Sequence, residues 1–113
     1  IEDILMTVID EIFDHAGQEA PRECCGLVIS NGKNEKYIPM KNLHEDNDNF
    51  EMDGQSFLYY QLNSNIKYIV HSHYQGDCRP SEHDINSCNE VGIPYLIVSY
   101  PNKDYHILEP TYE

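Results

Sequence analysis

Two histidines, a serine and an aspartate with a regular spacing are the residues of this sequence best suited to chemistry. They occur as His71-Ser72-His73, then seven residues, then Ser81, with Asp84 three positions later. On a strand, His71 and His73 would point to the same face with alpha carbons roughly 7 Å apart, so both imidazoles could reach one ion. A helix beginning at Ser81 would place Asp84 one turn in. Two imidazoles and one carboxylate leave a fourth tetrahedral position open, as in catalytic zinc sites.

This donor set favours zinc, although manganese, iron and cobalt accept similar ligands. Each part also has a simpler explanation. Two histidines at a strand end can be rim residues, and Ser81-x-x-Asp84 is close to a helix capping box. A zinc hydrolase also needs a carboxylate that takes a proton from water. Glu23, just before the first apolar run, is one such acid, although a lone charge there is usually solvated surface.

The elements that must position these residues follow from the hydrophobic pattern. We expect a first helix that ends at Gly17, a hairpin turn at Asn31-Gly32, and a polar surface loop over residues 42–49. The expected helices cover residues 2–16, from 53 or 56 to 62, and 81–91, and the strands 24–30, 36–40, 66–73, 94–100 and 105–108. This alternation predicts an α/β fold with a mixed central sheet flanked by two or three helices, with the strand order left open.

Composition excludes several classes of partner. Seven Lys and Arg against 20 Asp and Glu give a net charge of −13, which repels nucleic acid and anionic membrane surfaces. No apolar run is long enough to cross a bilayer, and an acidic start does not resemble a secretory signal. The 113 residues fit one domain, residues 1–113, which we expect to be cut from a longer protein. The four cysteines are expected to be reduced thiols in a cytoplasmic protein.

Together, these candidate site residues resemble the JAMM (MPN-plus) metalloprotease motif. That motif consists of a distant Glu, then H-x-H, seven residues and S-x-x-D. The match is residue for residue, and Glu23 is followed by Cys24-Cys25-Gly26. The resemblance implies a JAMM/MPN fold, similar to cytidine deaminase, with one zinc ion. It also implies roles for single residues: zinc ligands His71, His73 and Asp84, general base Glu23, and Ser81 to hold the tetrahedral intermediate.

Further segments, 50–57, 80–84 and 88–99, resemble the JAMM domains of phage tail assembly proteins of the lambda K type. This implies a zinc metallopeptidase of phage tails or cell walls, in the bacterial cytoplasm or on the virion. Its substrate would be a peptide or isopeptide bond in a tail protein, peptidoglycan or a ubiquitin-like conjugate. Proteins of this type commonly carry a C-terminal NlpC-type domain. One departure is Tyr74, where the family usually has Pro.

Three alternatives remain beside the metallopeptidase. The chain could be an inactive JAMM-like scaffold that binds a protein partner in tail assembly, although such scaffolds typically lose the Glu or a His. Cys24 or Cys25 could act as a nucleophile, but their apolar neighbours predict buried, inert thiols. A zinc deaminase needs a Pro-Cys-x-x-Cys segment, which this chain lacks. The other histidines are predicted to be structural or exposed: His15, His44, His83 and His106.

Overall fold

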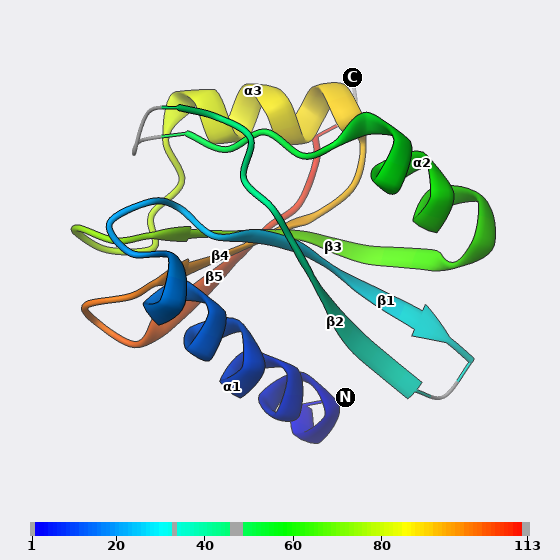
Figure 1. The fold of residues 1–113 in the computed structure, drawn as a ribbon, viewed down its shortest axis with the longest axis horizontal. Coiled ribbons are helices and arrows are strands. Elements are labelled where there is room, and N and C mark those ends of the chain that lie inside the picture. The colour runs from blue at the N-terminus through cyan, green and yellow to red at the C-terminus, as the bar shows by residue number, and fades with distance from the viewer. Residues whose placement is uncertain (1, 33, 46–48, 112–113) are drawn as a thin grey trace.

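The strands of this protein form one mixed sheet. The computed structural model describes residues 2–32, 34–45 and 49–111, with the backbone alone for residues 2–7 and 31. The strand order is β2-β1-β3-β4-β5, where β3 and β4 are parallel and the other neighbours antiparallel (Figure 1). The strands are β1 (Cys25–Asn31), β2 (Asn34–Met40), β3 (Asn65–His73), β4 (Tyr95–Ser99) and β5 (Asp104–Leu108). The predicted α/β fold with a mixed sheet is therefore confirmed.

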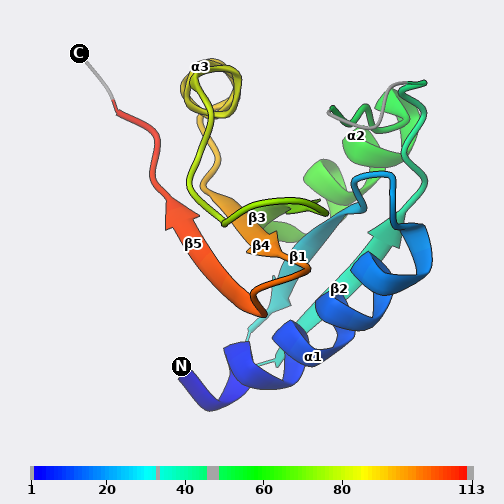
Figure 2. The same ribbon diagram turned by 90° about the vertical axis from the view of Figure 1, so that its left-hand side faces the viewer.

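Helices cover both faces of this sheet. Helix α1 (Glu2–Glu19) lies on one face, and α2 (Gly54–Asn63) and α3 (Glu82–Val91) lie on the other (Figure 2). Side chains alternate along each strand, so Val70, Leu96 and Val98 pack towards α1, whereas Ile69 and Ile97 pack on the opposite side. Coverage on both faces explains why the central strands read as continuous apolar runs.

The first helix is longer than predicted. Val8, Ile9, Ile12 and Ala16 are buried as the apolar stripe requires, while the side chains of Ile4 and Leu5 lie outside the described residues. The helix continues through Gly17 and ends at Glu19. A Cβ at Gly17 would lie 3.2 Å from the Tyr100 ring. This glycine therefore serves close packing and does not end the helix.

The ends of the other two helices follow the predicted capping residues. Asp53 caps α2, and its carboxylate accepts a hydrogen bond from the backbone N–H of Ser56 at 3.2 Å. Ser81 caps α3, which ends at Gly92 in the left-handed conformation that glycine adopts without steric cost, with φ at 72°. These caps fix where α3 begins over the carboxyl end of β3.

Candidate metal centre

The two histidines of the motif lie at the carboxyl end of β3 and share one face of the sheet. Their ring centroids are 5.2 Å apart, and His71 is fully buried while His73 is partly exposed. Ser72 points to the α1 side, where its hydroxyl accepts a hydrogen bond from the backbone N–H of Cys24 at 2.8 Å. The N–H of Ser72 donates to the carbonyl of Cys24 at 3.1 Å. This double contact fixes the entrance of β1 beside the histidines.

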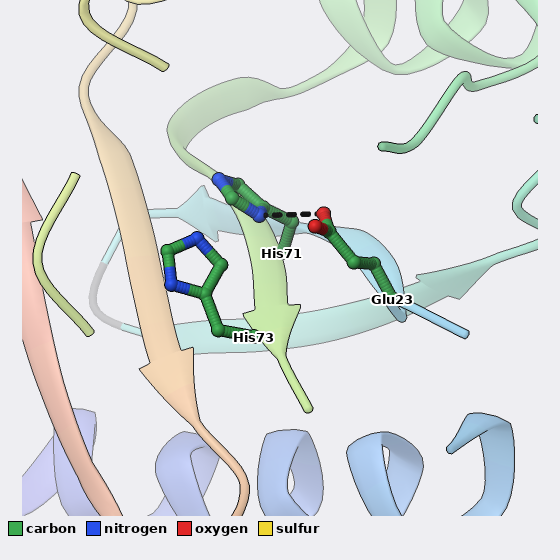
Figure 3. Close-up of side chains that lie close together, drawn as sticks. All are labelled: Glu23, His71 and His73. Carbon is green, nitrogen blue, oxygen red and sulfur yellow. Dashed lines mark hydrogen bonds and ion pairs between the residues drawn. The ribbon is translucent and has the colours of Figure 1, made fainter. Parts of the chain in front are cut away.

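Glu23 reaches the same site from the segment just before β1. It precedes Cys25 by two residues, and Cys25 pairs with His71 across the strands. Oε1 of Glu23 lies 3.1 Å from Nδ1 of His71, and the residue is buried at 6% exposure, so it is not solvated surface. The ligand atoms of Glu23, His71 and His73 all lie within 4.8 Å of one another (Figure 3).

Asp84 reaches the histidines from the first turn of α3. Its Oδ1 lies 3.0 Å from Nε2 of His71, and its Oδ2 lies 3.4 Å from Nε2 of His73. The same carboxylate accepts a hydrogen bond from the backbone N–H of Ser81 at 2.9 Å, and the Ser81 hydroxyl accepts one from the N–H of Asp84 at 3.1 Å. The predicted capping box is thus present together with the contacts to the histidines.

These residues fit a metal ion. Nε2 of His71 is buried and has no partner in hydrogen-bonding geometry, although Asp84 is only 3.0 Å away. Ligand atoms that share a tetrahedral ion at 2.0–2.1 Å are roughly 3.3 Å from one another. The separations between Asp84 and the two histidines are close to this value. Asp84 and the two histidines are therefore close enough to share one ion.

Two ligand sets are available, one with Glu23 and one with Asp84, and both include the two histidines. Nδ1 of His73 lies 2.8 Å from the carbonyl oxygen of Asp77, and Nδ1 of His71 faces Glu23. Carbonyl and carboxylate oxygens only accept hydrogen bonds, so both Nδ1 atoms carry protons and both Nε2 atoms are free to bind a metal. Both Nε2 atoms face Asp84. Asp84 thus lies against the Nε2 atoms of both histidines, and Glu23 lies beside His71 with its ligand atom within 4.8 Å of those of both histidines.

The charges of the site also suit a cation. Burial lowers the pKa of His71, but contacts with Asp84 and Glu23 outweigh it and raise the pKa to about 9. Contact with Asp84 raises the pKa of His73 against the effect of burial. Burial raises the pKa of Asp84, but the two histidines reverse this and hold it well below its usual range. In the metal-free protein a proton on His71 therefore neutralises part of the negative charge.

Sequence reasoning missed the residue that organises the loop before α2. Asn42 is buried, contrary to the predicted surface loop, and part of that loop, residues 46–48, lies outside the described residues. Its amide nitrogen donates to the carbonyls of Glu23 at 2.9 Å and Asn49 at 3.0 Å. Its amide oxygen accepts from the backbone N–H groups of His44 and Glu51. Asn42 thus ties this loop to Glu23 in the segment just before β1.

Two aromatic rings that the sequence did not indicate as part of the site lie against His71. The Phe50 ring stacks on it with centroids 4.7 Å apart and planes at 21°. Tyr95 meets it edge-on at 5.8 Å. Both rings exclude water from one side of His71 and orient its imidazole. Phe50 comes from a loop, so no helical or strand period marks it in the sequence. The only signal that could have indicated it is its position directly after the polar stretch 42–49.

The remaining histidines and cysteines have structural or surface positions. Nδ1 of His15 lies 2.7 Å from the Tyr37 hydroxyl, and burial lowers the pKa of His15. His44 is half-buried, and His83 and His106 are exposed as predicted. All four cysteines are free. Burial raises the pKa of Cys24 to about 11 and that of Cys25 to about 12, which argues against a thiolate nucleophile.

Comparison with known proteins gives matches along nearly the whole chain. A family model described as prokaryotic homologs of the JAB domain matches residues 6–108. The tail tip assembly protein K of Escherichia phage N15 is 36% identical over 103 residues, which is 90% of this chain and 42% of that protein. The chain therefore spans less than half of the length of this relative. Among the described residues, no helix is long and apolar enough to cross a membrane.

Solved structures share the fold. A Desulfitobacterium hafniense protein superposes with a TM-score of 0.72 at 26% identity, covering 89% of this chain and 77% of its own. A JAB1/MPN domain protein of Archaeoglobus fulgidus superposes with a TM-score of 0.64 at 21% identity, covering 90% and 83% of the two chains. The second likeness concerns the fold alone.

Proposed function

Because the chain belongs to the family of prokaryotic JAB-domain proteins, we propose that it is a zinc metallopeptidase that hydrolyses a peptide or isopeptide bond. The observation that carries the proposal is the convergence of His71, His73 and Asp84 on one point, with Glu23 against His71. Both Nε2 atoms face the Asp84 carboxylate, and both Nδ1 atoms have acceptors behind them. We assign these three residues as the metal ligands.

Glu23 acts as the general base in this proposal. A bound divalent metal supplies a Lewis acid that polarises the amide carbonyl and lowers the pKa of water. Glu23 contacts Nδ1 of His71 through Oε1, which leaves its second carboxylate oxygen to accept the proton of the attacking water. The same carboxylate then returns the proton to the leaving amine. Burial of Glu23 keeps bulk water from competing for this proton.

Ser81 stabilises the transition state. Its hydroxyl oxygen accepts a hydrogen bond from the N–H of Asp84, so the hydroxyl proton stays available to the carbonyl oxygen of the substrate. Ser81 is exposed at the start of α3, where a substrate can reach it. A preorganised donor of this kind lowers a barrier by roughly 3 kcal/mol. The N–H of Ser81 meanwhile holds Asp84 towards the histidines.

Tail assembly is the setting we propose. The relative from phage N15 is a tail tip assembly protein, so a protein of the growing tail is the substrate that its name favours. Peptidoglycan is the other substrate to consider, because phage tails meet the cell wall. In either setting residues 1–113 act as a single metallopeptidase domain.

The decisive experiment combines metal analysis with an activity assay. The chain is stripped with a chelator, reloaded with zinc, and incubated with tail proteins and with purified peptidoglycan, and products are identified by mass spectrometry. We expect one zinc per chain and cleavage by the reloaded protein alone. His71→Ala should bind zinc at least about 100-fold more weakly, whereas His83→Ala, an exposed histidine one residue before Asp84, should bind it normally.

Two results would overturn the proposal. Full zinc affinity in His71→Ala would show that the ligands are assigned wrongly. Normal zinc binding without cleavage of any offered substrate, combined with stable binding of a tail protein, would instead identify an inactive scaffold.

A further inference from the structure

A pocket adjoins the metal centre on the α2 and α3 side of the sheet. Its volume is about 250 Å³, and apolar side chains form most of its wall: Phe50, Met52, Phe57, Ile69, Val91 and Tyr95. They come from the loop before α2, from α2 itself, from β3 and β4, and from the end of α3 (Figure 2). Asp84 forms part of the wall next to the histidines.

The pocket and the metal centre share three residues. Phe50 stacks on His71, Tyr95 meets both rings edge-on, and Asp84 contacts the two histidines. A peptide whose amide lies over the histidines would therefore have a neighbouring side chain at the mouth of the pocket. The two sites are positioned to bind adjacent parts of one chain.

The size of the pocket limits what can fill it. Pockets that take a whole small-molecule ligand measure roughly 300–1,000 Å³. A volume of about 250 Å³ is smaller than these and suits one large side chain. Partly buried rings such as Phe50 and Phe57 give this side chain an apolar surface. A glycine or alanine would leave most of the pocket unfilled.

The apolar lining of the pocket also disfavours a charged occupant. An acidic side chain among these rings would lose part of its hydration, which costs binding energy. Asp84 is paired with the histidines, so the wall residues beside the apolar ones that could meet such a side chain are Glu51 and His83. The alanines and free carboxylates of peptidoglycan stem peptides are therefore poor occupants.

We infer that this pocket is a specificity subsite for a large neutral apolar side chain, such as Leu, Met or Phe, next to the scissile amide of a protein substrate. The inference rests on the proposed peptidase function and deepens it, because it selects polypeptides over cell-wall peptides. One large apolar side chain should raise kcat/KM by tens-fold over Gly at that position, since a single methylene can contribute about tenfold or more.

The test uses blocked glycine hexapeptides in which one residue is Gly, Ala, Leu, Phe or Asp. Cleavage by the zinc-loaded chain is followed by mass spectrometry. Binding of the same peptides is measured separately by amide chemical shifts of the chain. We expect Leu and Phe to be preferred at one position beside the cut, with the Gly and Asp peptides weakest. Binding should follow the same order.

Two variants of α3 provide a matched pair. Val91 lines the pocket at 43% exposure, and Ile85 on the same helix is 40% exposed but does not line it. Val91→Trp should reduce the preference for Leu over Gly to a few-fold, with zinc content unchanged. Ile85→Trp should retain the full preference.

The outcomes separate the subsite from the peptidase. Cleavage without apolar preference, or equal effects of both tryptophans, would overturn the subsite and leave the peptidase intact. No cleavage, but Leu-selective binding that Val91→Trp alone abolishes, would support the subsite and reject the peptidase. If neither cleavage nor binding favours Leu, the subsite is refuted.

Discussion

The two faces of the central sheet differ in what they bury. The α1 face is a core of mainly aliphatic and aromatic side chains, in which Ile12, Val70 and Leu96 are almost fully enclosed. The opposite face buries Ile69 and Ile97 near the middle of the strands, but Glu23, His71 and Asp84 at their carboxyl end. One face thus holds the sheet together, while the other also maintains buried charges. Stability and chemistry are therefore separable by substitution.

The largest effect is expected on turnover and at Glu23, which lies on the face with the proposed metal centre. Glu23→Gln keeps the shape and can still contact His71 but cannot accept a proton. Turnover should fall by about 10²–10⁴-fold, with zinc content and melting temperature nearly unchanged. The measurement is kcat together with metal analysis of the same sample. An empty metal site in this variant would make Glu23 a ligand, and unchanged turnover would assign the base elsewhere.

A loss of stability is expected in the apolar part of the α2/α3 face of the sheet. Ile97 is fully buried between the sheet and the α2/α3 layer, so Ile97→Ala should lower the free energy of unfolding by roughly 2–5 kcal/mol through lost burial and a cavity. Denaturant unfolding measures this change. Leu62→Ala, at a residue 74% exposed on α2, is the control and should change it by less than about 0.5 kcal/mol. Similar values for both would contradict the core described above.

Ser72 tests the contrast within a single strand. It lies between two proposed ligands but faces α1, where it accepts a hydrogen bond from the N–H of Cys24. Ser72→Ala leaves this buried donor without its partner and should cost about 1–3 kcal/mol of stability. Zinc affinity should change by less than tenfold because His71 and His73 keep their own contacts. A complete loss of zinc would show that the two faces are coupled at this point.

A pH dependence is expected at the polar end of the face, where His71 contacts Glu23 and Asp84. The folded pKa of His71, about 9, lies above its ordinary value of 6.5, so its proton stabilises the metal-free fold. That stabilisation is complete below about pH 6.5 and is lost as the pH rises through 9. Zinc competes with this proton, so its affinity should rise by about tenfold per pH unit over the same range. Chelator titrations and denaturant unfolding from pH 6 to 10 measure both, and flat profiles would reject the proton on His71.

Local patterns were sufficient to predict the elements but not all of their surroundings. The apolar runs of β1 and β3 follow from residues that are neighbours in sequence. The spacing of His71, His73 and Asp84 predicted that one strand and one helix start would bring them together, and the structure places them in contact. Their roles as metal ligands stay a prediction.

What the sequence did not reveal depends on contacts between distant segments. Asn42 binds the carbonyl of Glu23 across 19 positions, and no local period encodes such a bond. The predicted end of α1 was wrong for a similar reason. In the local pattern Gly17 indicates the end of a helix, whereas in the structure it allows the Tyr100 ring to pack closely against α1. The pocket beside His71 combines parts of four elements, so it emerged only with the fold.

The capping box at the start of α3 has an evolutionary consequence. Ser81 and Asp84 bind each other's backbone as well as serving the proposed metal centre, so helix α3 depends on them whether or not a metal is bound. A lineage that lost its metal would still be under selection to keep both residues. His71 and Glu23, by contrast, would be buried polar groups that serve no metal site, so their substitution by apolar residues would no longer be selected against. In related sequences, loss of the residues equivalent to Glu23 and His71 is therefore better evidence of an inactive descendant than loss of Ser81 or Asp84.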